Sequence, residues 1–165
     1  MTNTEVTDSL TLFGSFTSSS SYKPMLYLAL ARLPFSFRTV NLKYGAQKET
    51  DYLAVNRYGQ VPALRHRGLT IVQSNVILDY LARTTGHFAG STEQEQWTAR
   101  EWLVGDAPTI ADIGCWGRMV FMAEGGLDIS RWPNVAAWSR RLAAMPGFAL
   151  PYDLIPKRDR EVVPG

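Results

Sequence analysis

The chain has 165 residues, 45% of them apolar and 19% charged, so it is apolar enough to bury a core and too apolar for a disordered chain. This length predicts one domain or two small ones. Its 17 Lys and Arg against 15 Asp and Glu leave a formal net charge of +2. That balance provides no broad basic face, and we therefore expect no nucleic-acid partner.

Membrane and metal association are also disfavoured. The first ten residues contain no Lys or Arg and no apolar stretch, so they do not resemble a signal peptide. The longest apolar run, residues 25–31, is far shorter than the ~18 residues that span a bilayer. A single cysteine forms no internal disulfide, and two histidines are too few for a histidine-built metal site. We expect a cytoplasmic protein with no membrane partner and no bound metal.

The chain opens with a strand and an apolar helix. Residues 10–14 (LTLFG) are a short apolar run that ends in glycine, which predicts a buried strand. A serine-rich turn follows at residues 18–21. Pro24 is tolerated in the first turn of a helix, where its missing N–H costs nothing, so we expect the helix to begin between Ser20 and Lys23.

The rest of the first half predicts a small mixed sheet. In chain order we expect a strand, a short helix or turn, two short strands joined by a glycine turn, and a helix that Gly86 ends. These are residues 35–42, 49–55, 61–65 with 69–72, and 74–86. Strands that alternate with helices in this way are typical of an α/β arrangement.

No strand signal follows Gly86, so the second half is predicted to be all-helical. We expect helices over residues 92–103, from Thr109 to Met122, and over residues 134–145. Asp112 stands three residues after Thr109, as in a capping box with Asp in place of the usual Glu or Gln. A free cysteine on such a helix is typically a small buried apolar residue, which is our expectation for Cys115.

Five segments, in this order, resemble the cytosolic glutathione transferases of the bacterial, serine-type kind. They are LFGSFTSSSSYKPMLYLAL, GQVPAL, IVQSNVILDYLA, GDAPTIADIG and WPNVAAWSRRLAAMPGF. The resemblance covers roughly residues 10–156. It implies a thioredoxin-like, glutathione-binding domain over residues 1–86 and a helical C-terminal domain over residues 87–165. It also implies glutathione as co-substrate and a homodimer.

Activation of the glutathione thiol sets a chemical requirement that the serine run can meet. A thiol pKa of about 8.5 leaves little thiolate at neutral pH, so a hydrogen-bond donor and positive potential are needed at the sulfur. A helix N-terminus supplies roughly half a positive charge. The resemblance places the activating serine at Ser18, with Ser19 and Ser20 as neighbours able to substitute. By itself, a serine run before a helix is more often a cap and loop.

The resemblance also implies how glutathione would be held. Val61, which precedes the family's cis-proline at Pro62, would offer its backbone to the cysteinyl part. Gln73 and Ser74 would hold the γ-glutamyl carboxylate at a helix N-terminus, where anions bind well. Gln60 is an additional candidate contact to the glycyl part or the backbone. On the residues alone, Pro62 also fits an edge strand and Ser74 an ordinary N-cap.

Two departures from the family affect the expected activity. Pro24 and Met25 stand where an aliphatic residue and then arginine are usual. The segment over residues 86–156 is shorter than the family's helical domain, and TAREWLVGDAPTIAD looks like a splice that omits a helical hairpin. In the family, that hairpin lines the electrophile site and supplies much of the dimer interface.

Several functions remain open. The first is a glutathione transferase in which the activated thiol attacks a small electrophile. A zeta-like isomerase is an alternative, favoured by SSSSY and by the QS pair and disfavoured by the missing arginine. A third is a non-catalytic glutathione-binding or interaction module that lost the electrophile site, and a fourth is a deletion form of a longer enzyme. The sequence identifies no electrophile.

Overall fold

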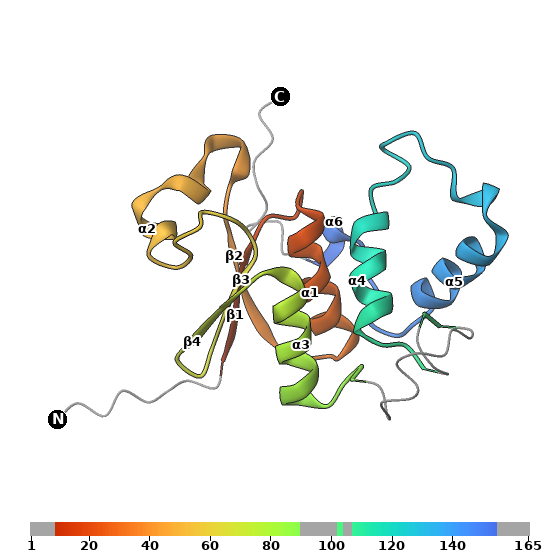
Figure 1. Cartoon of the computed structure of the whole chain (residues 1–165), viewed down its shortest axis with the longest axis horizontal. Helices are drawn as coiled ribbons and strands as arrows, with labels where there is room; N and C mark the ends of the chain where they lie inside the picture. Colours follow the sequence, from red (N-terminus) through yellow and green to blue (C-terminus); the bar gives the residue numbers. More distant parts are fainter. Residues whose placement is uncertain (1–8, 90–101, 104–106, 155–165) are drawn as a thin grey trace.

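The computed structural model describes residues 9–89, 102–103 and 107–154. The chain has two consecutive parts. The helix α1 belongs to the first part and lies between the sheet and the helices of the second part (Figure 1). The first part consists of β1 (Leu10–Gly14), α1 (Ser19–Leu30), β2 (Phe35–Thr39), α2 (Thr50–Leu53), β3 (Ala63–His66), β4 (Leu69–Val72) and α3 (Ser74–Thr85). The second part contains α4 (Ile110–Met119), α5 (Pro133–Ala143) and α6 (Pro151–Leu154).

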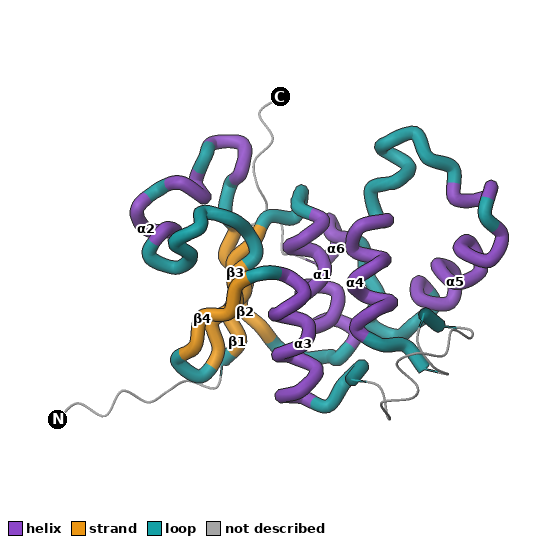
Figure 2. Tube along the Cα trace, in the orientation of Figure 1, coloured by secondary structure: helices purple, strands orange, loops and turns teal. Residues whose placement is uncertain are grey.

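The four strands form one mixed sheet in the order β2-β1-β3-β4. β1 runs parallel to β2 and antiparallel to β3, and β3 is antiparallel to β4. The parallel pair is joined through α1, as parallel strands require a crossover. α1 and α3 lie on one side of the sheet and the segment with α2 on the other (Figure 2). The expected thioredoxin-like α/β half is confirmed.

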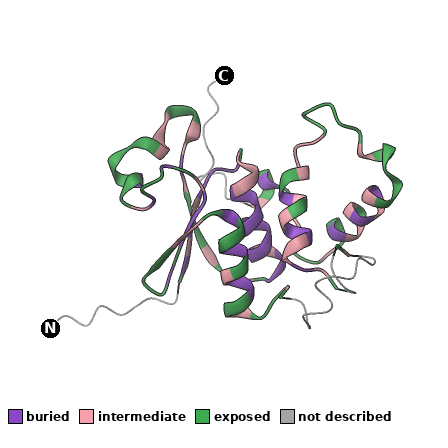
Figure 3. Ribbon diagram, viewed as in Figure 1, coloured by how far each residue is buried: buried purple, intermediate pink, exposed green. Residues whose placement is uncertain are grey.

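α1 is buried along nearly its whole length (Figure 3). Met25, Leu26 and Leu28 have no exposed surface, and Tyr22 and Tyr27 are buried beside them. One side of the helix packs against β1 and α3 and the other against α4 and α6. A helix covered on several sides carries apolar residues all round, which is why the apolar run here shows little alternation.

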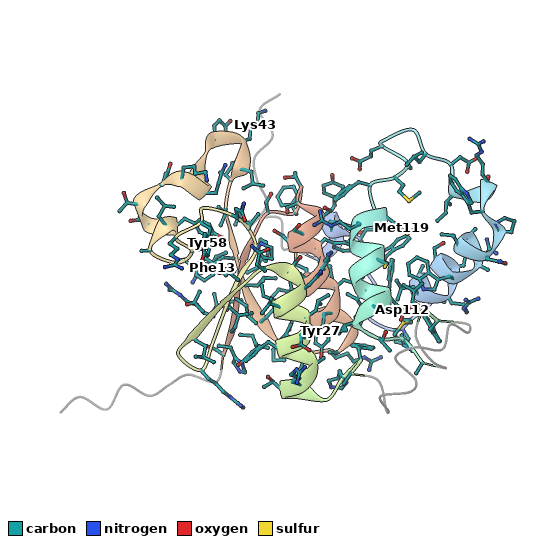
Figure 4. All side chains as sticks on the ribbon, in the orientation of Figure 1. Phe13, Tyr27, Lys43, Tyr58, Asp112 and Met119 are labelled. Atoms are coloured by element: carbon teal, nitrogen blue, oxygen red, sulfur yellow. The ribbon has the colours of Figure 1, made fainter. Side chains whose placement is uncertain are left out.

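The second part is held together by Asp112 in the first turn of α4 (Figure 4). One carboxylate oxygen accepts from the Thr109 N–H at 2.8 Å, and the other accepts from the Leu103 N–H at 3.0 Å and the Trp138 Nε1–H at 2.7 Å. The predicted capping box is therefore present. Because Trp138 lies on α5, the same carboxylate joins α5 to the start of α4.

The helix boundaries correct several expectations. α1 begins at Ser19, so Pro24 stands in its second turn and not in its first. The helix begins earlier because Ser18 caps it, although the Pro24 nitrogen cannot donate to the Ser20 carbonyl. α4 ends at Met119 rather than Met122, where a series of turns begins.

Three further expectations differ from the structure or fall outside the described residues. β2 ends at Thr39, three residues before the predicted end. The helix predicted over residues 92–103 lies almost wholly outside the described residues, and its last two residues, Trp102 and Leu103, are bends. Cys115 is exposed and not buried, because the packing of α4 on its neighbours leaves this position open. Among the described residues, no helix is long and apolar enough to cross a membrane.

Replacing Asp112 by alanine should destabilise the protein strongly. The change leaves the Leu103 N–H and the Trp138 Nε1–H without their acceptor, and each such loss costs roughly 1–3 kcal/mol. We expect the free energy of unfolding to fall by about 3 kcal/mol in a urea titration followed by tryptophan fluorescence. Asp128→Ala, which removes an exposed cap on Ser130, is the matched control and should change little. A loss below about 1 kcal/mol for Asp112→Ala would contradict this account of the helical half.

Candidate functional site

The strand register brings the predicted site segments to one edge of the sheet. Phe13 near the end of β1 pairs with Ala63 at the start of β3, and Ala63 pairs with Val72 at the end of β4. The segment after β1, the segment before β3 and the segment after β4 therefore meet at the same edge. They carry, respectively, the serines 18–20, the residues 60–62, and Gln73 with Ser74. α1 and α3 begin at this edge (Figure 1).

Ser18 is the N-cap of α1. Its backbone is extended, with φ −98° and ψ 114°, and its Oγ accepts from the Ser21 N–H at 3.3 Å. The backbone N–H of Ser18 donates to the Ser15 carbonyl at 3.0 Å, which fixes the turn before the helix. A hydroxyl that accepts one bond still has its own O–H to donate. The half-buried Ser18 side chain can therefore give a hydrogen bond to a ligand group bound at the N-terminus of α1.

Positive potential surrounds this N-terminus. Ser19 and Ser20 are the first two residues of α1, and the N–H groups of a first turn have no partner inside their helix. No acidic residue stands in the first turn. Arg118 reaches across from α4 and donates from Nη1 to the Ser19 Oγ at 3.1 Å. The helix dipole and the guanidinium both favour an anion here.

The segment before β3 is held rigidly by buried side chains. The Gln60 carbonyl accepts from the Tyr52 hydroxyl at 2.7 Å and from the Asn56 amide at 2.6 Å. Burial raises the pKa of Tyr52 to about 12, so its hydroxyl stays protonated and able to donate at neutral pH. The Val61–Pro62 peptide bond is cis. The side chain of Gln60 is exposed, that of Val61 half-buried and that of Pro62 buried.

Gln73 and Ser74 form the start of α3. Gln73 has φ 72° and ψ 118°, a conformation that non-glycine residues rarely adopt, and its side chain makes no cap hydrogen bond. Ser74 is 8% exposed and is the first helical residue, so the interpretation of Ser74 as an ordinary N-cap is wrong. The cap position belongs to Gln73. As in α1, the first turn of α3 contains no acidic residue.

The structure thus gathers all eight candidate residues at one edge, with two helix N-termini facing it. Sequence reasoning missed Arg118, which is distant from Ser19 in the chain and belongs to no local motif. It also missed the roles of Tyr52 and Asn56 in holding Gln60. Only the three-dimensional packing of α4 against α1 places Arg118 here.

Comparison with known proteins matches the first part of the chain to a defined domain. Residues 8–83 match the family model for the glutathione S-transferase N-terminal domain. A glutathione S-transferase of Silene vulgaris is 34% identical over 74 residues, and a maleylacetoacetate isomerase of Mus musculus is 40% identical over 75 residues. These matches cover 45% and 44% of this chain and 34% and 35% of the relatives. The chain therefore spans about a third of the length of these relatives.

The similarity to solved structures extends further along the chain. The crystal structure of a possible glutathione S-transferase from Rhodopseudomonas palustris superimposes with a TM-score of 0.80 at 29% identity. This match covers 89% of the present chain and 99% of the other. The helical second part is therefore included in the likeness. Residues 8–83 are thus similar to the N-terminal domain of glutathione S-transferases, and the fold of the chain is similar to that of the solved Rhodopseudomonas palustris protein.

Proposed function

We propose that the chain binds glutathione at the edge described above and activates its thiol for attack on a small electrophile. The observation that carries this proposal is the position of Ser18, whose O–H is available at the start of a helix free of acidic residues in its first turn. The match of residues 8–83 to the family domain supports it. Residues 1–86 would form the glutathione-binding domain, and residues 87–165 the shortened helical domain.

Ser18 would act by stabilising the thiolate relative to the thiol. Its hydroxyl donates a hydrogen bond to the sulfur, and the N–H groups of Ser19 and Ser20 add the positive end of the helix dipole. Each pKa unit by which the thiol is made more acidic corresponds to about 1.4 kcal/mol of preference for the thiolate. A reduction by about two units would convert most of the bound thiol to thiolate at neutral pH. Ser19 or Ser20 could replace Ser18 in part.

The remaining contacts would hold the peptide. The backbone of Val61 before the cis Pro62 would contact the cysteinyl part, and the exposed Gln60 side chain would reach the glycyl end. Gln73 and Ser74 would bind the γ-glutamyl carboxylate at the N-terminus of α3, since the unpaired N–H groups there favour anions. The rare backbone conformation of Gln73 supports this role, because such conformations persist where function requires them.

The reaction itself is a nucleophilic substitution or addition. The thiol proton leaves to solvent, and the thiolate sulfur forms a bond to the electrophilic carbon. In a substitution, a leaving group such as chloride departs with the bonding electron pair. The chain would act in the cytoplasm, as a homodimer.

Two other functions are favoured by specific observations. The 40% identity to a maleylacetoacetate isomerase supports a glutathione-dependent isomerase. Met25 stands where the resemblance implies an arginine, which argues against this alternative. The segment over residues 86–156, which is shorter than the helical domain that the resemblance implies, supports a glutathione-binding module without turnover.

Turnover separates a transferase from a binding module. We expect the protein to conjugate glutathione with 1-chloro-2,4-dinitrobenzene, and Ser18→Ala to lower kcat/KM by about 100-fold, as the loss of one donor to a developing charge typically does. Ser9→Ala changes a serine outside the site and is the matched control. Glutathione binding in calorimetry without any turnover by the unmodified protein would establish the binding module instead.

Because the backbone at Gln73 is strained, we expect a glycine at this position to raise the stability of the fold while it weakens glutathione binding. Gln73→Gly should raise the free energy of unfolding by about 1 kcal/mol, because glycine lacks the Cβ that disfavours positive φ. The same change removes a carboxylate contact and should weaken glutathione binding several-fold in calorimetry. Gln73→Ala removes the side chain but keeps the strain, so it should weaken binding without stabilising the fold. Equal stabilisation by both variants would show that the strain is absent.

A further inference from the structure

A hollow of about 460 Å³ lies at the opposite end of the strands from the edge that carries Ser18. The start of β1 and the hairpin of β3 and β4 line it (Figure 1). None of the eight candidate glutathione-site residues is among its lining residues. A hollow of this volume lies within the range of about 300–1,000 Å³ that is typical of small-molecule sites. It is therefore large enough for a ligand of its own.

The strand register gathers polar side chains on the face of the sheet where this hollow lies. Thr11 pairs with Arg65, and Arg65 pairs with Thr70. Cross-strand partners point to the same face of a sheet, and so does Phe13, two residues after Thr11. The Phe13 ring contacts Tyr52 of α2, so this is the face on the side of α2 and not that of α1. One arginine and two hydroxyl groups therefore stand in a row across three strands.

Arg65 is held in place by an aromatic ring. Its guanidinium carbon lies 5.2 Å from the centre of the Phe13 ring, and that ring packs against Tyr52 with 6.4 Å between the centroids. A guanidinium that stacks on a ring keeps its N–H donors in its own plane, directed away from the ring. Among the described residues, no carboxylate pairs with Arg65. The stacking thus fixes the charge and leaves donors for a ligand.

A second arginine comes from the tip of the hairpin. His66 pairs with Leu69, so Arg67 and Gly68 form a two-residue turn. Their φ angles are 50° and 76°, and a turn of this kind requires positive φ at both positions. Arg67 and Gly68 both line the hollow. A guanidinium has five N–H donors, so Arg67 can keep its contacts within the protein and still bind an anion.

The charge of the chain is divided unevenly between its parts. Residues 9–89 contain nine Lys and Arg but three Asp and Glu, a formal net charge of +6. The remaining residues contain eight Lys and Arg and twelve Asp and Glu, a formal net charge of −4. Among the described residues, no acidic side chain lines the hollow. The first part therefore attracts anions, and the hollow offers them a place where two guanidinium groups converge.

We propose that this hollow binds the phosphate group of a small, soluble phosphate monoester. The phosphate lies between Arg65 and Arg67, because planar guanidinium groups match phosphate geometry and bind it through paired, charge-assisted hydrogen bonds. The hydroxyl groups of Thr11 and Thr70 donate to the remaining oxygens. The Leu69 side chain, which is 54% exposed, contacts the organic part of the ligand. This inference goes beyond the proposed function and does not depend on glutathione binding.

A titration with phenyl phosphate tests the proposal. At about pH 7.5 the ester carries nearly two negative charges. In amide NMR spectra of isotope-labelled protein, we expect the Gly68 and Thr70 signals to shift saturably with a Kd below about 1 mM. The Ser19 signal, which reports the N-terminus of α1, should stay unchanged. Benzoate, with one charge, and phenol, with none, should bind at least about tenfold more weakly.

Substitution of the arginines tests which groups recognise the phosphate. Arg65→Gln and Arg67→Gln change exposed side chains, so the fold should be retained, and each should weaken binding of phenyl phosphate about tenfold. Thr70→Val removes a hydroxyl and keeps the branched shape, and should weaken binding several-fold. Arg38→Gln is the matched control. Arg38 is exposed on the same face, beside Phe13 on β2, and does not line the hollow, so its loss should leave the Kd unchanged.

Several outcomes would overturn the proposal. Equal weakening by Arg38→Gln and Arg65→Gln would show a diffuse positive potential without a site. Shifts at Ser19 but not at Gly68 would place the anion at the N-terminus of α1. Tighter binding of a short oligothymidylate than of phenyl phosphate would assign the face to single-stranded nucleic acid, and binding only to vesicles that contain phosphatidic acid would assign it to a membrane surface.

The two proposals fail separately. If glutathione binds and phenyl phosphate leaves the Gly68 and Thr70 signals unchanged, the proposed function stands and this inference alone is refuted. If phenyl phosphate binds at the hairpin and glutathione does not bind, the inference stands without the proposed function.

Discussion

The burial of α1 on nearly all sides is the constraint on which the rest of the structure depends. The sheet and α3 cover one side of this helix, and α4 and α6 cover the other. Each fully buried Leu or Met side chain contributes about 1.5–3 kcal/mol, so the two parts of the molecule are coupled through one apolar helix. The N-terminus of that helix is consequently fixed in space. A fixed N-terminus can hold its N–H groups and Ser18 toward a ligand without further ordering.

The helical part contributes to this edge even though it is short. Asp112 fixes the start of α4 and joins it to Trp138, and the packing of α4 on α1 delivers Arg118 to Ser19. The resemblance implies an arginine at the position of Met25, within α1 itself. In this chain, Arg118 of α4 supplies a cation beside Ser19 instead. The positive potential at the serine run is therefore built by tertiary packing and not by the helix sequence alone.

Local signals predicted much of this arrangement. The β1 run, the glycine turn before β4 and the Thr109–Asp112 box each act within a few residues, and the ordered motifs brought the eight candidate residues together. The missing N–H of Pro24 led to a wrong start for α1, because the Ser18 cap and the burial of the helix on several sides outweigh the bond that Pro24 cannot make. The expectation that Cys115 is buried was also wrong, because the sequence does not show which side of α4 the neighbouring helices cover. Arg118 reaches Ser19 only through the packing of α4 on α1, which no local pattern encodes.

The pKa of the bound glutathione thiol is the quantity that depends most directly on thiolate stabilisation by Ser18. Thiolate absorbance in the ultraviolet, followed against pH with the protein in excess over glutathione, reports ionisation of the sulfur at the site. If Ser18 stabilises the thiolate, the bound thiol has a pKa well below the free value of about 8.5, and its pKa returns toward that value in Ser18→Ala while glutathione stays bound. A bound thiol that titrates like free glutathione, or one whose pKa is unchanged in Ser18→Ala, would contradict it.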